Sequence, residues 1–143
     1  AALSKDVIFE RQLRSSVMNE LPIAVSIFAG DPPQVVDMNL KEREMLKLDE
    51  SHDRSRDLGA SQAQFAVRFA DGTPLTVDNA PVTTAIRTGK ATGPFMLIVR
   101  RGDGTHIQTR TYCAPFFDDA GNVAGAVVTS EPLDIAVTPG IDG

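Results

Sequence analysis

The first twenty residues carry apolar side chains at helical spacing and contain no Gly or Pro. Leu3, Val7, Leu13 and Val17 fall on one stripe of such a helix, and polar residues are expected on the opposite face. The pattern predicts an amphipathic helix that ends before Pro22. Because a single helix cannot bury its own stripe, we expect it to dock on the rest of the domain or on a second copy of itself.

Two short apolar runs follow, at residues 23–28 and 34–38, with a Gly-Asp-Pro-Pro turn between them. They predict a β-hairpin. Asn39 then has the position and chemistry of a helix N-cap, and Glu42, three residues on, has the spacing of a capping box. A helix is therefore expected to begin after Asn39.

The pattern is weaker in the middle of the chain. Residues 49–64 are rich in charged residues and Ser and show no apolar period, while residues 65–69 alternate only weakly. After a turn at residues 71–74, Asp78 or Asn79 is expected to cap a second short helix. Pro81 lies near its first position and Gly89 follows its end.

From Gly93 onward the period changes to that of strands. Residues 95–101, 106–117 and 123–130 predict three strands, with turn signals at 103–105 and 118–122, and Pro132 is expected to end the last one. The order of elements predicts an α+β domain.

Composition and charge narrow the class of protein. The chain has 143 residues, 42% of them apolar and 23% charged, as is typical of one soluble globular domain. The net charge of −5, with acids and bases mixed along the chain, argues against a nucleic-acid-binding surface. The single cysteine, Cys113, excludes an intramolecular disulfide. No apolar run is long enough for a membrane span and no signal pattern is present, so we expect a cytoplasmic domain excised from a longer protein.

Several local strings resemble the PAS domain, the sensory module of bacterial sensor kinases and regulators. They are Leu21-Pro22-Ile23-Ala24-Val25, Val36-Asp37-Met38-Asn39, residues 71–89, residues 100–105 and residues 114–127. Two positions depart from the usual pattern: Leu40 follows the capping Asn, and the exit signature is reduced to Pro132-Leu133-Asp134. On this resemblance we expect residues 21–134 to form the sensory domain, residues 1–20 a dimerising or capping helix, and residues 135–143 a tail or linker.

The resemblance implies a PAS-like five-stranded antiparallel sheet flanked by short helices, with space for a small ligand between them. The strand parity of the family turns one set of side chains toward that space: Phe95, Leu97, Val99, Ile107, Thr109, Thr111, Cys113, Ala126, Val128 and Ser130. Two interpretations of the hydroxyls stay open, since Thr109, Thr111 and Ser130 either orient a ligand or are ordinary strand residues. The opposite face is also apolar, and the N-terminal helix is the candidate to cover it.

No cofactor is expected. A flavin-based blue-light sensor of this family needs a reactive Cys in an Asn-Cys-Arg-Phe-Leu-Gln string on a helix, whereas Cys113 lies on a predicted strand and is expected to be structural. Haem-binding relatives use a His on the long helix, and residues 80–89 contain none. His52 and His106 are isolated in the sequence, so no metal site is expected.

These features favour a signalling domain over an enzyme. Residues 88–92, Thr-Gly-Lys-Ala-Thr, lack the upstream Gly and the Ser or Thr that a phosphate loop needs. We expect the domain to bind a small molecule or a partner, to form a homodimer, and to pass a signal through its flanking helices to an attached output domain. Two alternatives remain: a ligand-free homodimerisation module, and a small cone-fold isomerase, for which no Asp or Glu falls on the inner strand faces to act as a base.

Overall fold

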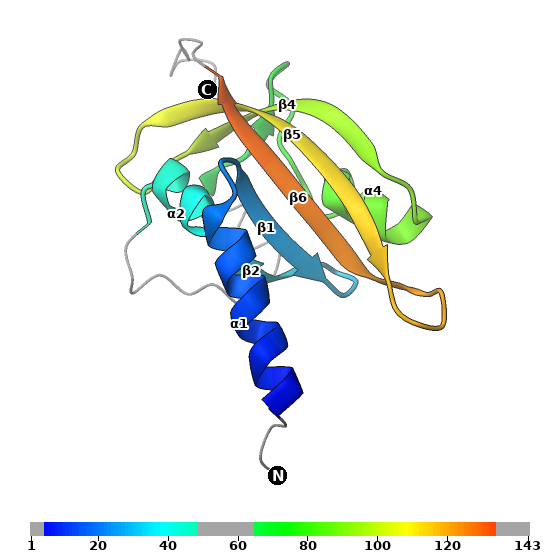
Figure 1. Ribbon diagram of the computed structural model, residues 1–143. Helices are drawn as coiled ribbons and strands as arrows, with labels where there is room; N and C mark the ends of the chain where they lie inside the picture. Colours follow the sequence, from blue (N-terminus) through cyan, green and yellow to red (C-terminus); the bar gives the residue numbers. More distant parts are fainter. Residues whose placement is uncertain (1–4, 49–64, 134–143) are drawn as a thin grey trace.

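A single antiparallel sheet carries the other elements of the structure (Figure 1). This computed structural model describes residues 5–48 and 65–133. Helix α1 spans Lys5–Glu20 and is followed by β1 (Ala24–Ala29), β2 (Gln34–Met38) and helix α2 (Leu40–Leu46). Then come β3 (Arg68–Phe69), helix α4 (Pro81–Thr88), β4 (Thr92–Arg100), β5 (His106–Phe117) and β6 (Val123–Leu133).

The sheet has the strand order β2-β1-β6-β5-β4-β3, and every neighbouring pair is antiparallel. Helix α2 packs against β1, and α4 packs against β4, β5 and β6. The expected α+β class and the antiparallel sheet flanked by short helices are confirmed. The short strand β3 was not expected; its two residues pair with Leu97 and Ile98 on β4.

The predicted strands lie close to the observed ones, and the bounds of β2 and β5 are as predicted. The expectation that Pro132 ends the last strand was wrong, because β6 continues to Leu133. The reason lies in the neighbouring strand: β1 begins at Ala24, which pairs with Ser130. Beyond Ser130, β6 is an edge strand on that side, where a proline is tolerated.

Asn39 is fully buried and joins three elements. Its Oδ1 accepts a hydrogen bond from the backbone N–H of Glu42 at 3.0 Å, which caps α2 as predicted, and another from Val25 on β1 at 3.0 Å. Its side-chain amide donates to the carbonyl of Met18 in α1 at 2.8 Å and to that of Ile23 at 2.9 Å. One side chain therefore ties the end of α1 to β1 and α2.

Glu42 does not complete the predicted capping box. In that motif its carboxyl would accept the backbone N–H of Asn39. Here this N–H donates to the carbonyl of Val25 on β1 at 2.9 Å. Because strand β1 accepts the Asn39 N–H, this N–H is not the partner of the Glu42 carboxyl.

The predicted cap of α4 was also wrong. Ala80 is the N-cap residue and has no side-chain cap bond. The Asn79 side chain instead closes the preceding turn, accepting from the Thr76 N–H at 2.7 Å and donating to the Pro74 carbonyl at 3.0 Å. Gly89 ends the helix with φ of 68°, as expected.

Helix α1 contacts the body through its last turn. Met18 is buried, whereas Phe9, Leu13 and Val17 are 64%, 53% and 52% exposed. Figure 1 shows α1 extending beyond the body, and its contacts with the other elements include α2. The capping role and the dimer role of α1 both stay predictions.

Some expectations fall outside the described residues: those for Leu3, for the side chain of Val7, for His52 and for residues 135–143. The division of the chain at residues 20 and 134 stays a prediction.

We predict that Asn39→Ala lowers the free energy of unfolding by about 4 kcal/mol. The substitution removes four side-chain hydrogen bonds, each contributing about 1 kcal/mol. Urea unfolding measures the change. Asn79→Ala is the matched control, since it removes two exposed side-chain hydrogen bonds. Equal losses in the two variants would contradict the central role of Asn39.

Candidate ligand cavity

A cavity of about 130 Å³ lies between the sheet and the helices α2 and α4. Apolar side chains from the strands, the helices and the segments between them form most of its wall. They are Phe28, Val35, Met38, Met45, Leu46, Phe65, Val67, Leu75, Ala80, Pro81, Val82, Leu97, Val99 and Val128. The exceptions are Glu42, Cys113 and four hydroxyl-bearing residues: Ser26, Thr109, Thr111 and Ser130. The cavity is therefore apolar with a few polar groups, as small-molecule sites commonly are.

The sheet register brings most of the expected pocket residues together. Leu97 lies opposite Thr109, Thr111 opposite Ser130, and Cys113 opposite Val128. Seven of the ten residues expected to face inward line the cavity: Leu97, Val99, Thr109, Thr111, Cys113, Val128 and Ser130.

Phe95 and Ile107 do not line the cavity. Phe95 packs edge-to-face on Phe69 of β3, with ring centroids 6.3 Å apart. Ile107 packs against the cluster formed by Leu46, Phe65 and Val99, three residues that themselves line the cavity. Ala126, also expected to face inward, belongs to the packed core.

The cavity hydroxyls form a short hydrogen-bonded chain. Thr109 Oγ1 and Thr111 Oγ1 are 3.1 Å apart, and Thr111 Oγ1 and Ser130 Oγ are 3.5 Å apart. All three residues are buried. Hydroxyl groups can rotate to donate or accept, so this chain can adjust to either kind of polar ligand atom.

Glu42 is an acidic residue of the cavity wall that sequence reasoning did not place there. Its side chain is buried, and its Oε2 has no hydrogen-bond partner. Burial raises the pKa of this carboxyl to about 7, and no charged side chain among the described residues adds to the shift. Its spacing from Asn39 signalled only a capping box. Nothing local in the sequence separates that role from a place in the cavity wall.

Cys113 lies in the same wall but has a different character. Burial raises the pKa of its thiol to about 12, although a hydrogen bond with Thr92 acts in the opposite direction. The thiol therefore stays protonated at neutral pH, as suits a structural cysteine.

Other kinds of site are not evident in the part of the chain that the structure describes. Within residues 5–48 and 65–133, no group of three or more His, Cys, Asp or Glu residues could hold a metal ion. Among the helices described, none is both long and apolar enough to cross a membrane.

We predict that Glu42→Gln changes how stability depends on pH. Because the folded pKa is raised above the unfolded value of about 4.5, the folded state holds the proton more tightly. Wild-type stability should therefore fall as pH rises from 4.5 to 7, by on the order of 3 kcal/mol. The Glu42→Gln variant has no carboxyl at this position, so its stability should not show this fall with pH.

Urea unfolding at a series of pH values measures the difference. Glu44→Gln is the control, since Glu44 lies on the same helix with an exposed side chain. Parallel pH profiles for the wild type and Glu42→Gln would contradict the assignment.

Comparisons with known proteins identify the fold. No family model matches the chain, and no curated protein does. Among solved structures, the LOV protein of Rhodobacter sphaeroides has a TM-score of 0.65 and 13% identity, covering 87% of this chain and 68% of that chain. A PAS domain from Colwellia psychrerythraea has a TM-score of 0.61 and 10% identity, covering 87% of this chain and 97% of that chain. The LOV domain of the Erythrobacter litoralis EL346 blue-light activated histidine kinase has a TM-score of 0.60 and 17% identity, covering 80% and 98%. The chain has the fold of PAS domains.

Proposed function

We propose that this chain is the sensory domain of a larger signalling protein and that it binds a small molecule in the cavity. The observation that carries the proposal is the cavity itself, an apolar space with a few polar groups in its wall. The fold neighbours include a domain of a histidine kinase and the PAS domain of an HTR-like protein from Haloarcula marismortui. These associations favour signalling as the setting.

A route for the signal runs from the cavity wall to α1. Helix α2 supplies Glu42, Met45 and Leu46 to the wall. The same helix is capped by Asn39, whose amide is hydrogen-bonded to Met18 in the last turn of α1. A ligand with different affinities for two positions of α2 would therefore bias the direction of α1.

The proposed ligand is not a flavin or a haem. A cavity of about 130 Å³ is close to the cavity of about 150 Å³ that holds one benzene ring, so it suits one ring better than several fused ones. The strand position and raised pKa of Cys113 also disfavour a thiolate that attacks a cofactor.

Two alternative functions are each supported by one observation. The exposed row of Phe9, Leu13 and Val17 would suit a ligand-free homodimerisation module. Glu42 supplies the cavity carboxyl that an isomerase would need as its base. Deuterium uptake from D2O into a small ketone, lost in Glu42→Gln, would favour the isomerase. The structures that the chain resembles are PAS and LOV domains, which supports the sensory role.

We predict that freshly purified protein carries a small molecule, and that Leu97→Phe displaces it by filling the cavity. Native mass spectrometry followed by extraction measures the occupancy, and we expect no visible flavin or haem band in the same sample. Met96→Phe is the matched control, since the neighbouring position on β4 is not part of the cavity wall. An empty wild type, made more stable by Leu97→Phe, would favour the ligand-free module instead.

We predict that the exposed row on α1 holds a homodimer together and that Leu13→Glu dissociates it. A charge in an apolar interface is costly to desolvate. Light scattering after gel filtration measures the mass. Gln12→Glu adds the same charge at the adjacent exposed position and should leave the dimer intact. A wild-type protein that is monomeric at high concentration would contradict the prediction.

A further inference from the structure

The buried carboxyl of Glu42 is an energetically unfavourable feature of the cavity. Its carboxyl is removed from water, its Oε2 has no hydrogen-bond partner, and it lies in a largely apolar wall. An unpaired buried charge is strongly unfavourable, so such a group either keeps its proton or acquires a partner.

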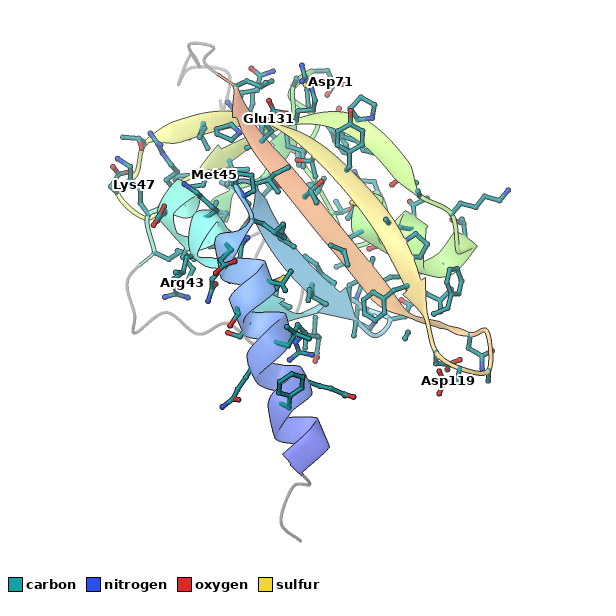
Figure 2. The ribbon with its side chains drawn as sticks, in the orientation of Figure 1. Arg43, Met45, Lys47, Asp71, Asp119 and Glu131 are labelled. Atoms are coloured by element: carbon teal, nitrogen blue, oxygen red, sulfur yellow. The ribbon has the colours of Figure 1, made fainter. Side chains whose placement is uncertain are left out.

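Within residues 5–48 and 65–133, the charged side chains around α2 are engaged or directed elsewhere. Strand β1, which packs on α2, contains no ionisable residue. Lys47, after the end of α2, is 3.0 Å from Asp103 in the turn between β4 and β5. Figure 2 shows Arg43 pointing away from the sheet and Met45 lying on the side of α2 nearer to it. The described side chains of α1 near its end, Arg14 and Glu20, are exposed.

We propose that the cavity takes a small amphipathic amine, whose ammonium group binds the Glu42 carboxyl while its apolar part fills the space beside Leu97, Val99 and Val128. This inference rests on the proposed sensory function and names the chemical class of its ligand. The bound pair would supply the opposite charge that the carboxyl lacks. No covalent step is involved.

The rest of the wall suits this class better than the others. An ammonium group has three N–H donors, and the hydroxyl oxygens of Ser26, Thr109 and Thr111 are acceptors in the same cavity. An anion would place a second negative charge in an apolar space, where none of the described wall residues is cationic. A pure hydrocarbon would leave the carboxyl uncompensated.

The size of the cavity limits the amine. A volume of about 130 Å³ is close to that of a cavity which holds one benzene molecule. An aromatic ring with one aminomethyl group is therefore a suitable probe.

The test compares benzylamine with benzyl alcohol, which has nearly the same shape but no charge at neutral pH. Affinities are measured by titration of ¹⁵N-labelled protein, following the backbone amides of Thr109, Thr111 and Cys113, which line the cavity. We expect wild type to bind benzylamine at least about tenfold more tightly than benzyl alcohol, the ratio typical of one hydrogen bond to a charged group.

Two variants make the assignment specific. Glu42→Gln keeps the shape and removes the charge, so the preference for the amine should fall to within about twofold. Glu44→Gln removes an exposed charge two residues along α2 and should preserve the preference. In addition, benzylamine should lower the pKa of Glu42, followed by ¹³C NMR of its carboxyl carbon, because the ammonium stabilises the carboxylate.

The outcomes separate this inference from the proposed function. Equal affinities for the two probes, with cavity amides shifted by both, would overturn the amine proposal and leave the ligand-binding function standing. A preference that survives Glu42→Gln or disappears in Glu44→Gln would place the charge recognition elsewhere and also overturn it. If neither probe shifts the cavity amides in wild type or Glu42→Gln, both the amine proposal and the ligand-binding function fail.

Discussion

The arrangement of this domain depends on one buried amide, the side chain of Asn39. It uses both its acceptor and its donor groups, accepting from β1 and α2 and donating to the end of α1 and to the segment before β1. Neither Asp, which has no donor when ionised, nor Ser, which has a single O–H, could satisfy all of these backbone groups. The position of α2, and with it one wall of the cavity, follows from this hydrogen-bond network.

The cavity combines two features that lower stability. A cavity in the core forfeits packing contacts between side chains, and a buried carboxyl oxygen without a partner loses its hydration. The two hydrophobic clusters of the described core supply much of the cavity wall, including Phe28 and Val82 from one cluster and Phe65 from the other. The two unfavourable features occur together, where the sheet faces α2. A bound molecule that supplied both apolar volume and a polar partner would offset both of them.

The likeness to PAS and LOV structures at 10% to 17% identity concerns the curved sheet and its flanking helices. One fold supports many ligands, so the ligand class has to be inferred from the side chains of this particular cavity. Here the hydroxyl chain is neutral and adaptable, whereas Glu42 carries the only carboxyl among the described residues of the wall. In the proposed function, charge recognition is therefore assigned to α2, the helix that Asn39 also connects to α1.

The sequence by itself determined the features that depend on neighbouring residues. Alternation of apolar and polar residues predicted β2 and β5, and helical spacing of apolar residues predicted α1. Asn39 marked the start of α2, and Gly89 marked the end of α4. Strand parity, taken with the family resemblance, placed Leu97, Thr109, Thr111 and Ser130 on one face, because alternation follows from backbone geometry. Only the tertiary structure decided the role of Glu42. The spacing of Glu42 from Asn39 is the same whether Glu42 completes a capping box or lies in the cavity wall. The capping box does not form because the carbonyl of Val25 on β1 accepts the Asn39 N–H. Pro132 is likewise accommodated because β1 begins opposite Ser130, a pairing between residues more than a hundred positions apart. Hydrogen bonds between residues far apart in the sequence cannot be predicted from the local order of apolar and polar residues.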